Sequence, residues 1–392
     1  MTRIKITDEH DDEKTLFRSR KIHLNGKKIT SPIKSIDMSK ISSTLDVKQS
    51  IRSVNEIFRK LTPEKTTLLM KDADEQKAFD YSINSEINKT KDEEINVFIV
   101  EYESQKYPTG KSLEYISDNV HSFSDLVTIP LIEDLSRNLK TEKDFKEYLS
   151  FLNAFLGEIR RLNKKPIMGI VPMVPWIYME DLANFYLKNG VNAFCFDFEC
   201  KSPLSVGRSL RPFFKVLNDE DLLGNSLLYA LNVSTGKMVR ASGIAPAKDI
   251  LSFSIGFDIL GQKHKMLRGP KELYEKMKKE EKKFRLFNKD DYGYYSLSLK
   301  GQLQKFYPKD SSIPIKTALQ IAEKNISRVQ SVVNMEQQGL ESLILQDKIK
   351  NDEVIKHLQA KKNITDVDKK IIFKIRDQII SKAMSLKGFF SK

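Results

Sequence analysis

The stretch PIMGIVPMVPWIYMEDLANFYLKNGVNAFCFDF, residues 166–198, decides the fold class. Two apolar runs within it, 166–172 and 192–198, have the length and composition of buried strands. Between them, residues 179–189 carry apolar side chains at helical spacing, which predicts a helix. Because a strand, a helix and a second strand form the repeating unit of parallel α/β proteins, this stretch predicts that class.

The same alternation extends in both directions along the chain. Further helices are predicted over 45–60, 141–163, 204–217 and 244–252. Eight strands are predicted, over 33–37, 66–70, 96–101, 125–130, 166–172, 192–198, 226–233 and 254–260. This number of strands, each with its helix, predicts an α/β fold of the (β/α)8 TIM-barrel type. A doubly wound open sheet is the alternative, although IKSIDMSKIS, residues 33–42, lacks that fold's glycine-rich phosphate loop.

Three parts of the chain follow from this pattern. Residues 1–30 are predicted to be an N-terminal tail and a β-hairpin that turns at Asn25-Gly26 and closes the bottom of the barrel. Residues 31–309 hold the barrel and a basic post-barrel segment, which contains a predicted helix over 270–284 and a strand-like run over 290–299. Residues 310–392 are rich in helix formers and are predicted to be a helical C-terminal extension.

The charge of the chain is strongly positive and unevenly distributed. The net charge is +13, and residues 261–289 carry eleven Lys and Arg against four Glu. A cluster of this kind favours a polyanionic partner such as nucleic acid, because binding releases condensed counterions. A surface that only keeps the protein in solution remains the alternative.

The two cysteines, Cys195 and Cys200, lack the spacing of a structural zinc site or a disulfide framework. We expect free thiols in a reducing cytoplasm, with no metal and no cofactor. No apolar run reaches membrane-spanning length, and the polar N-terminus does not resemble a signal peptide. The sequence therefore predicts a cytoplasmic protein without a membrane partner.

Acidic residues follow most of the predicted strands, where the loops of a barrel build its mouth. Glu101, Asp197 and Asp258 are the candidate catalytic carboxylates, because neighbouring buried acids can divide into a nucleophile and a base. For each one taken singly, a helix cap or an ion pair is the alternative interpretation. The other acids near strand ends are Asp37, Glu103, Glu133, Asp134 and Glu199.

Further residues around this mouth are candidate ligand contacts. Glu103, Tyr102, Glu199 and Asn232 are predicted to bind substrate, and packing at the rim is the alternative for Tyr102. The loop after the eighth strand is expected to hold the phosphates of a nucleic acid through Lys263, His264, Lys265, Arg268 and Lys271.

Two segments resemble the tRNA-guanine transglycosylase superfamily, which includes the queuine and archaeosine tRNA-ribosyltransferases. RSRKIHLNGKKITSPIKSID, residues 18–37, is similar to the family's N-terminal hairpin and first strand. GIAPAKDILSFSIGFDI, residues 243–259, is similar to the run that ends in the family's eighth strand. The order of segments is similar over about residues 15–300. Matching positions are Gly243, Pro246, Asp249, Ile250, Gly256 and Asp258.

The resemblance implies a pentosyltransferase that replaces guanine in nucleic acid, tRNA more than DNA, by a 7-deazaguanine-type base. One carboxylate would attack the anomeric carbon, and another would deprotonate the incoming base. Gly169 falls in the fifth-strand segment that contacts the substrate in the family. The resemblance also implies a homodimer, or a heterodimer with a catalytic paralogue.

The chain departs from the family pattern at four places, one of which is the end of the sixth strand, where Asp197 and Glu199 replace a pair of glycines. Gly261 stands where the family has its nucleophilic Asp, Glu101-Tyr102-Glu103-Ser104 replaces an Asp-Ser-Gly-Gly segment, and the zinc motif is absent. Two interpretations follow. The first is a divergent base-exchange enzyme that uses Glu101, Asp197 and Asp258, and the second is a non-catalytic subunit that binds nucleic acid or a catalytic partner. A barrel glycosidase is a third, less favoured alternative.

Overall fold

The computed structural model describes residues 4–162, 165–239, 243–265, 283–298 and 302–380. The fold is mixed α/β, and its central strands form two parallel sheets, which confirms the predicted class. One sheet has the order β4-β14-β12-β11-β10-β8, and the other has the order β5-β6-β7-β9. The strands are β4 (Ile33–Lys34), β5 (Ile36–Asp37), β6 (Val54–Leu61), β7 (Ile95–Tyr102), β8 (Val127–Thr128), β9 (Leu131–Ile132), β10 (Ile167–Pro172), β11 (Ala193–Asp197), β12 (Leu227–Leu231) and β14 (Ile259–Leu260).

The two sheets share two extended segments of the chain. Only Ser35 separates β4 from β5, and only Ile129 and Pro130 separate β8 from β9. In the segment 33–37, Ile33 pairs with Ile259 of β14, and Asp37 pairs with Glu56 of β6. The first and last strands of the parallel series are therefore neighbours.

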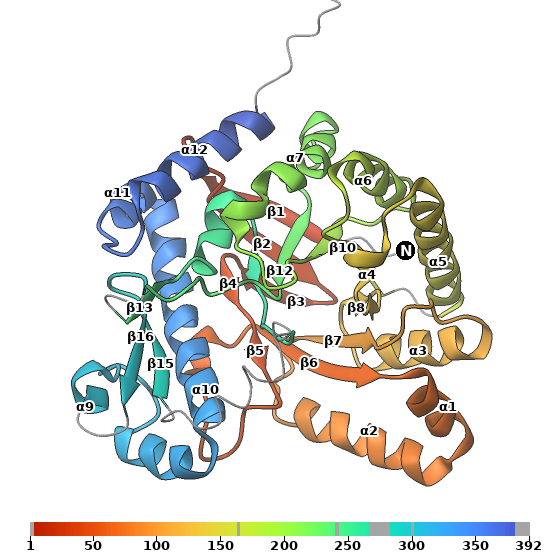
Figure 1. Cartoon of the computed structure of the whole chain (residues 1–392), viewed down its shortest axis with the longest axis horizontal. Coiled ribbons are helices and arrows are strands. Elements are labelled where there is room, and N and C mark those ends of the chain that lie inside the picture. Colours follow the sequence, from red (N-terminus) through yellow and green to blue (C-terminus); the bar gives the residue numbers. More distant parts are fainter. Residues whose placement is uncertain (1–3, 163–164, 240–242, 266–282, 299–301, 381–392) are drawn as a thin grey trace, which may run out of the picture.

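Helices lie along the outside of these strands (Figure 1). The helix α5 illustrates why they form, because Thr141 and Asp144 make a reciprocal capping box at its first turn. Its apolar stripe, which includes Phe155, is buried against the strands. The helices on the parallel part of the chain are α1 (Pro63–Lys71), α2 (Ala73–Ile87), α3 (Gly110–Ser122), α4 (Leu135–Asn138), α5 (Glu142–Arg161), α6 (Met179–Lys188) and α7 (Pro203–Asp219), with 3-10 turns η1 (Gln49–Ile51), η2 (Trp176–Tyr178) and η3 (Ile250–Ile255).

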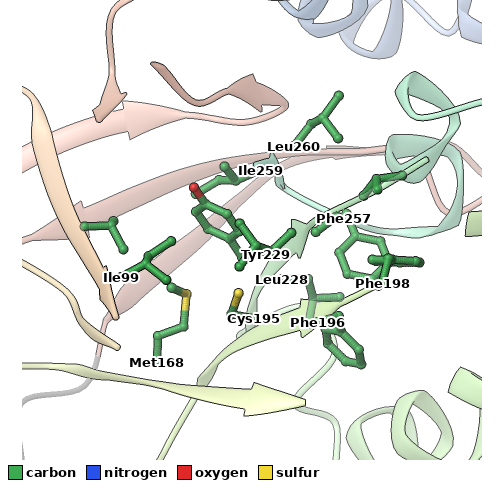
Figure 2. Packing of buried hydrophobic residues seen from close by; sticks show 14 of the residues in the cluster. Ile99, Met168, Cys195, Phe196, Phe198, Leu228, Tyr229, Phe257, Ile259 and Leu260 are labelled. Carbon is green, nitrogen blue, oxygen red and sulfur yellow. The ribbon is translucent and has the colours of Figure 1, made fainter. Parts of the chain in front are cut away.

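A single apolar cluster joins the two sheets. Ile99 of β7 belongs to the four-stranded sheet, whereas Met168, Cys195 and Tyr229 belong to the six-stranded sheet, and all four are buried. Figure 2 shows these side chains in one cluster. Because side chains of both sheets pack in the same core, the sheets enclose it together.

The N-terminal hairpin is confirmed, with its turn at the predicted place. The strands β2 (Arg18–Leu24) and β3 (Lys27–Thr30) are joined by Asn25 and Gly26, whose φ angles of 50° and 83° fit a type I′ turn. The strand β1 (Lys5–Asp11), which the sequence analysis did not predict, pairs with β2.

The C-terminal part packs on the parallel sheets. Ile51 of η1 lies against Gly339 of α10, where an added Cβ would approach it to 2.7 Å. In the same way, Ile375 of α12 lies so close to Gly207 of α7 that an added Cβ would clash with it. A small antiparallel sheet joins this region. Its elements are β13 (Ile244–Pro246), β15 (Lys283–Asn288) and β16 (Gly293–Ser298), and the helices are α9 (Gln302–Phe306), α10 (Ile315–Lys350), α11 (Val354–Gln359) and α12 (Asp366–Ile380).

Three predicted elements are wrong, and the strand predicted over 254–260 is a strand only at Ile259–Leu260, in β14. Residues 45–60, predicted as a helix, contain η1 and most of β6, and residues 66–70, predicted as a strand, lie in α1. Thr62 caps α1 and Pro63 occupies its first turn, which is a standard helix start. The predicted helix 244–252 is β13 followed by η3.

Most of the predicted basic helix over 270–284 lies outside the described residues, and Lys283 and Phe284 begin β15. Within the described part of the chain, no helix combines the length and apolar character needed to cross a bilayer.

Candidate functional site at the carboxyl ends of the strands

A short segment, Gln262–Lys265, lies across the face where the parallel strands end; we call it the crossing segment. Asn232, which follows β12, holds it in place. Its Oδ1 accepts hydrogen bonds from the backbone N–H groups of His264 and Lys265, at 2.8 Å and 3.0 Å. Its own N–H donates to the carbonyl of Gln262 at 3.0 Å. Asn232 therefore fixes the crossing segment, a role different from the predicted substrate contact.

The crossing segment brings a cation to two of the predicted catalytic acids. The Lys265 Nζ lies 2.7 Å from Asp197 Oδ2 and 3.7 Å from Glu101 Oε1. Burial alone would lower the pKa of Lys265, but Asp197 and Glu101 outweigh it and raise that pKa. The two acids do come together as the sequence predicts, but a lysine of the same chain forms ion pairs with both.

A second lysine completes this acidic group. Lys60, at the end of β6, places its Nζ 2.6 Å from Glu103 Oε1 and 3.1 Å from Glu101 Oε2. Next to these groups is a cavity of about 460 Å³, which we call cavity A. The residues that line it are Lys60, Glu101, Glu133, Asp134, Ser136, Arg137, Met173, Glu199, Cys200, Lys201 and Lys265.

Glu56 is a buried acid on this face that the sequence analysis missed. Its Oε2 lies 2.6 Å from His264 Nε2, and the hydroxyl groups of Ser35 and Tyr229 donate to its Oε1. The His264 ring also stacks on Phe58, with ring centroids 4.1 Å apart. Burial alone would raise the pKa of Glu56, but the bond and charge of His264 outweigh it and hold that pKa below its usual value. Little in the sequence signals it, because Asn55, Arg59 and Lys60 are also polar and hide the strand that holds Glu56.

A second cavity, cavity B, lies on the other side of the crossing segment. Its volume is about 490 Å³, and the strand ends β4 and β14, the small antiparallel sheet and α10 contribute to its walls. Lys34 lines cavity B. Its ammonium group donates hydrogen bonds to the carbonyls of Leu260 and Gly261, at 3.2 Å and 2.6 Å. Burial lowers the pKa of Lys34 to about 8, against the opposing charges of Glu56 and Asp249.

Asp249 lines cavity B as part of a buried polar group. Tyr294 donates its hydroxyl to Asp249 Oδ2 at 2.5 Å, and Gln338 of α10 donates to the same atom at 2.8 Å. Burial raises the pKa of Asp249, although the bond from Tyr294 opposes that rise. This group ties η3, β16 and α10 to one another.

The predicted position of Asp258 is wrong. It precedes β14 and lies at the amino-terminal end of the strands, on the side away from Asp197 and the crossing segment. Its carboxylate oxygens accept hydrogen bonds from Nε and Nη2 of Arg18, at 3.0 Å and 2.5 Å, and from the backbone N–H of Leu228, at 2.8 Å. The apolar run 254–260 predicts a strand that contains Asp258, whereas η3 occupies the start of this run and the strand begins after Asp258.

Two predicted substrate contacts also face elsewhere. A Cβ added at Gly169 would lie 2.7 Å from the Tyr186 ring, so this glycine faces α6. Tyr102 is buried at the end of β7, and burial together with Glu64 of α1 raises its pKa. Neither residue lines cavity A or cavity B.

The predicted phosphate contacts divide into three groups. Lys263 is exposed and lines cavity B. His264 and Lys265 do not lie on the outer rim, because their side chains are 7% and 18% exposed and pair with acids of the site. Arg268 and Lys271 lie outside the described residues.

Comparisons with known proteins add no assignment. No protein-family model matches the chain, and no curated protein matches it. Across the part of the chain that the structure describes, no group of three or more His, Cys, Asp or Glu side chains is placed to hold a metal ion.

Proposed function

We propose that the protein is a (β/α)8 barrel of the transglycosylase type that binds nucleic acid without exchanging its bases. Three features support the barrel. The eight extended segments follow one another in parallel, the segments 33–37 and 127–132 each belong to both sheets, and Ile33 pairs with Ile259. One shared core (Figure 2) agrees with a closed ring of strands.

The position of Lys265 is the observation that carries the non-catalytic part of the proposal. A carboxylate that attacks an anomeric carbon needs a free lone pair in contact with the sugar. Here the ammonium group of Lys265 lies between Asp197 and Glu101, and Lys60 covers the other oxygen of Glu101. Asp197 accepts hydrogen bonds at both oxygens, whereas Glu101 is held by ion pairs alone among the described residues.

The surroundings of Gly261 support the same conclusion. The resemblance places the family's nucleophile here, yet an added Cβ would lie 2.6 Å from the Tyr229 ring and 2.9 Å from the carbonyl of Ala230. Those contacts are closer than atoms tolerate, so no side chain fits without displacing Tyr229 from Glu56. The position is thus closed to a nucleophile.

Cations around the site support a polyanionic ligand. Lys263 makes no ion pair with a described residue, and two further cations at the site pair only loosely, Lys40 with Asp37 at 3.9 Å and Arg137 with Asp134 at 3.8 Å. Loosely held surface cations remain available to phosphates. Together with the net charge of +13, they favour nucleic acid as the ligand.

Base exchange is the second candidate function. It is favoured by cavity A, because about 460 Å³ beside Glu101 and Glu199 gives room for a heterocycle whose N–H groups would donate to these acids. A ligand that displaced Lys265 would release Asp197 and Glu101 for chemistry.

A binding experiment tests the main proposal. Fluorescence anisotropy with labelled tRNA is expected to show saturable binding that Lys40→Glu/Lys263→Glu weakens by roughly tenfold or more, with a salt dependence reduced by about two counterions. The control is Lys77→Glu/Lys143→Glu on α2 and α5, which makes the same change in net charge on outer helices. Equal affinity of the two double variants would remove cavity B from the binding surface.

An incorporation experiment separates the two candidate functions. The protein is incubated with labelled guanine or a labelled 7-deazaguanine base, together with tRNA or duplex DNA. We expect no label in either polymer, from the natural chain or from Gly261→Asp. Label that enters a polymer and is lost in Asp197→Asn would instead establish base exchange.

A further inference from the structure

A groove on the outside of the parallel sheets lies between α6 and α7, which are neighbours (Figure 1). Its volume is about 390 Å³. One end of the groove is formed by η2. This turn begins at Trp176, four residues after β10 ends at Pro172 on the carboxyl-end face. The groove is therefore close to cavity A, since Met173, between β10 and η2, lines that cavity.

Three cations line the groove along α7. Arg208, Arg211 and Lys215 recur at intervals of three and four residues, so they share one face of the helix. The rise of an α-helix spreads them over roughly 10 Å along its axis. None of the three makes an ion pair with a described residue, although two acids, Glu180 and Asp219, also border the groove.

An exposed aromatic surface lies beside these cations. Trp176, the single tryptophan of the chain, is 65% exposed in η2, and its neighbour Ile177 is 53% exposed. Large apolar side chains at this exposure commonly mark contact surfaces. An indole beside guanidinium groups offers a face on which a base can stack while the cations meet its phosphates.

We infer that the α6/α7 groove binds single-stranded nucleic acid, with phosphates on Arg208, Arg211 and Lys215 and a base stacked on Trp176. A duplex would present its phosphates but keep its bases inside, so the exposed indole favours an unpaired strand. This inference goes beyond the proposed function, because the groove lies outside the carboxyl-end face and would stand if that face bound nothing.

Trp176 provides its own reporter, because it is the only tryptophan in the chain. The probe is hexauridylate, with hexathymidylate in parallel. We expect saturable quenching of the tryptophan fluorescence, and an affinity whose logarithm falls with the logarithm of salt concentration with a slope of about −2 for three phosphate contacts. Arg208→Ala/Arg211→Ala/Lys215→Ala is expected to weaken binding by more than tenfold and to remove most of that slope.

The stacking contact is tested separately with a labelled oligonucleotide. Trp176→Ala is expected to lower the affinity by roughly tenfold while the salt slope stays the same, since no charge is removed. The charge-matched control is Lys71→Ala/Lys77→Ala/Lys316→Ala, which should bind as the natural chain does. These lysines lie on α1, α2 and α10, none of which contributes a residue to the groove.

Two results would overturn the inference. One is an unchanged tryptophan signal at saturating hexauridylate. The other is a polyglutamate affinity equal to the hexauridylate affinity, with the same loss of affinity in Arg208→Ala/Arg211→Ala/Lys215→Ala. That result would assign the groove to acidic protein segments. This outcome can be distinguished from a failure of the proposed function. If only the proposed function fails, Lys40→Glu/Lys263→Glu leaves the affinity for tRNA unchanged, whereas the groove variants still lower the affinity for hexauridylate.

Discussion

Lys34 is the residue with the most unusual environment on the carboxyl-end face. Its ammonium group is fully buried, and burial lowers its pKa to about 8, below the ordinary value of 10.5. The folded protein therefore disfavours the protonated form. Between these two pH values the unfolded chain keeps the proton that the folded chain has released, so stability rises with pH across this interval.

The pH dependence of unfolding tests this effect. We expect the natural chain to gain free energy of unfolding, relative to Lys34→Met, as pH rises from about 8 to 10.5, measured by urea unfolding. Lys40→Met, a partly exposed lysine of the same cavity, is the control and should track the natural chain. Parallel stability curves for the natural chain and Lys34→Met would refute the effect.

The candidate site could be predicted from the sequence only in part. Asp197 and Glu101 meet because both end parallel strands, and that rule can be read from the chain alone. The position of Lys265 could not be predicted, because it depends on Asn232 turning the crossing segment inward. Asp258 was misplaced because its partner, Arg18, lies 240 residues away in the chain.

Among the elements, the hairpin strand β2 is fastened to the parallel strands by a buried ion pair. Arg18 pairs with Asp258 and also donates to the carbonyls of Leu223 and Ser226, at 2.6 Å and 2.9 Å. Ser31, after β3, adds a hydrogen bond to Asp258 at 3.2 Å. The hairpin therefore satisfies a buried carboxylate and closes the amino-terminal side of the sheets.

Removing one partner of this pair should be costly. Arg18→Met is expected to lower the free energy of unfolding by about 3–5 kcal/mol, because Asp258 then stays buried without its cation. Arg18→Met/Asp258→Asn should recover part of that loss, and Arg160→Met on the exposed side of α5 is the control. Urea unfolding measures all four proteins. A double variant no more stable than Arg18→Met would contradict the ion-pair explanation.

The elements that the sequence did not predict share a physical cause. The strand β6 holds Asn55, Glu56, Arg59 and Lys60, and polar residues in a buried strand break the apolar run that marks one. In contrast, the TTLLM run looks like a strand, but the helix start at Thr62 and Pro63 decides its structure. Elements with an uninterrupted apolar pattern, such as α5 and the first four residues of β11, agree with the prediction.

At the scale of the whole molecule, the C-terminal helices are packed into the rest of the fold. Gln346 of α10 donates to the carbonyls of Thr30 and Pro32, at 2.8 Å and 3.0 Å, and Ile51 packs against Gly339. The helix α12 packs on α7 and η3, and α10 packs on β4 and η1, on the hairpin strands β1 and β2 and on β15 of the small antiparallel sheet. These contacts favour one cooperative folding unit.

A truncated chain tests that cooperativity. Residues 1–314, which lack α10, α11 and α12, are expected to show no cooperative urea transition, whereas tryptophan fluorescence and far-UV circular dichroism of the full chain should change at the same midpoint. Gly339→Ala should keep the single transition and lose about 1–3 kcal/mol from crowding against Ile51. A truncated chain that unfolds with the midpoint of the full chain would argue for two units.

The pairing of Ile33 with Ile259 and the packing of α10 beside β4 also limit how far the chain can fold during its synthesis. A ribosome that adds 5–20 residues per second needs roughly 11–45 s to pass from Ile33 to Ile259. During that time the nascent first strand has no neighbour on one edge. We therefore expect chaperones to occupy the N-terminal half until translation is nearly complete.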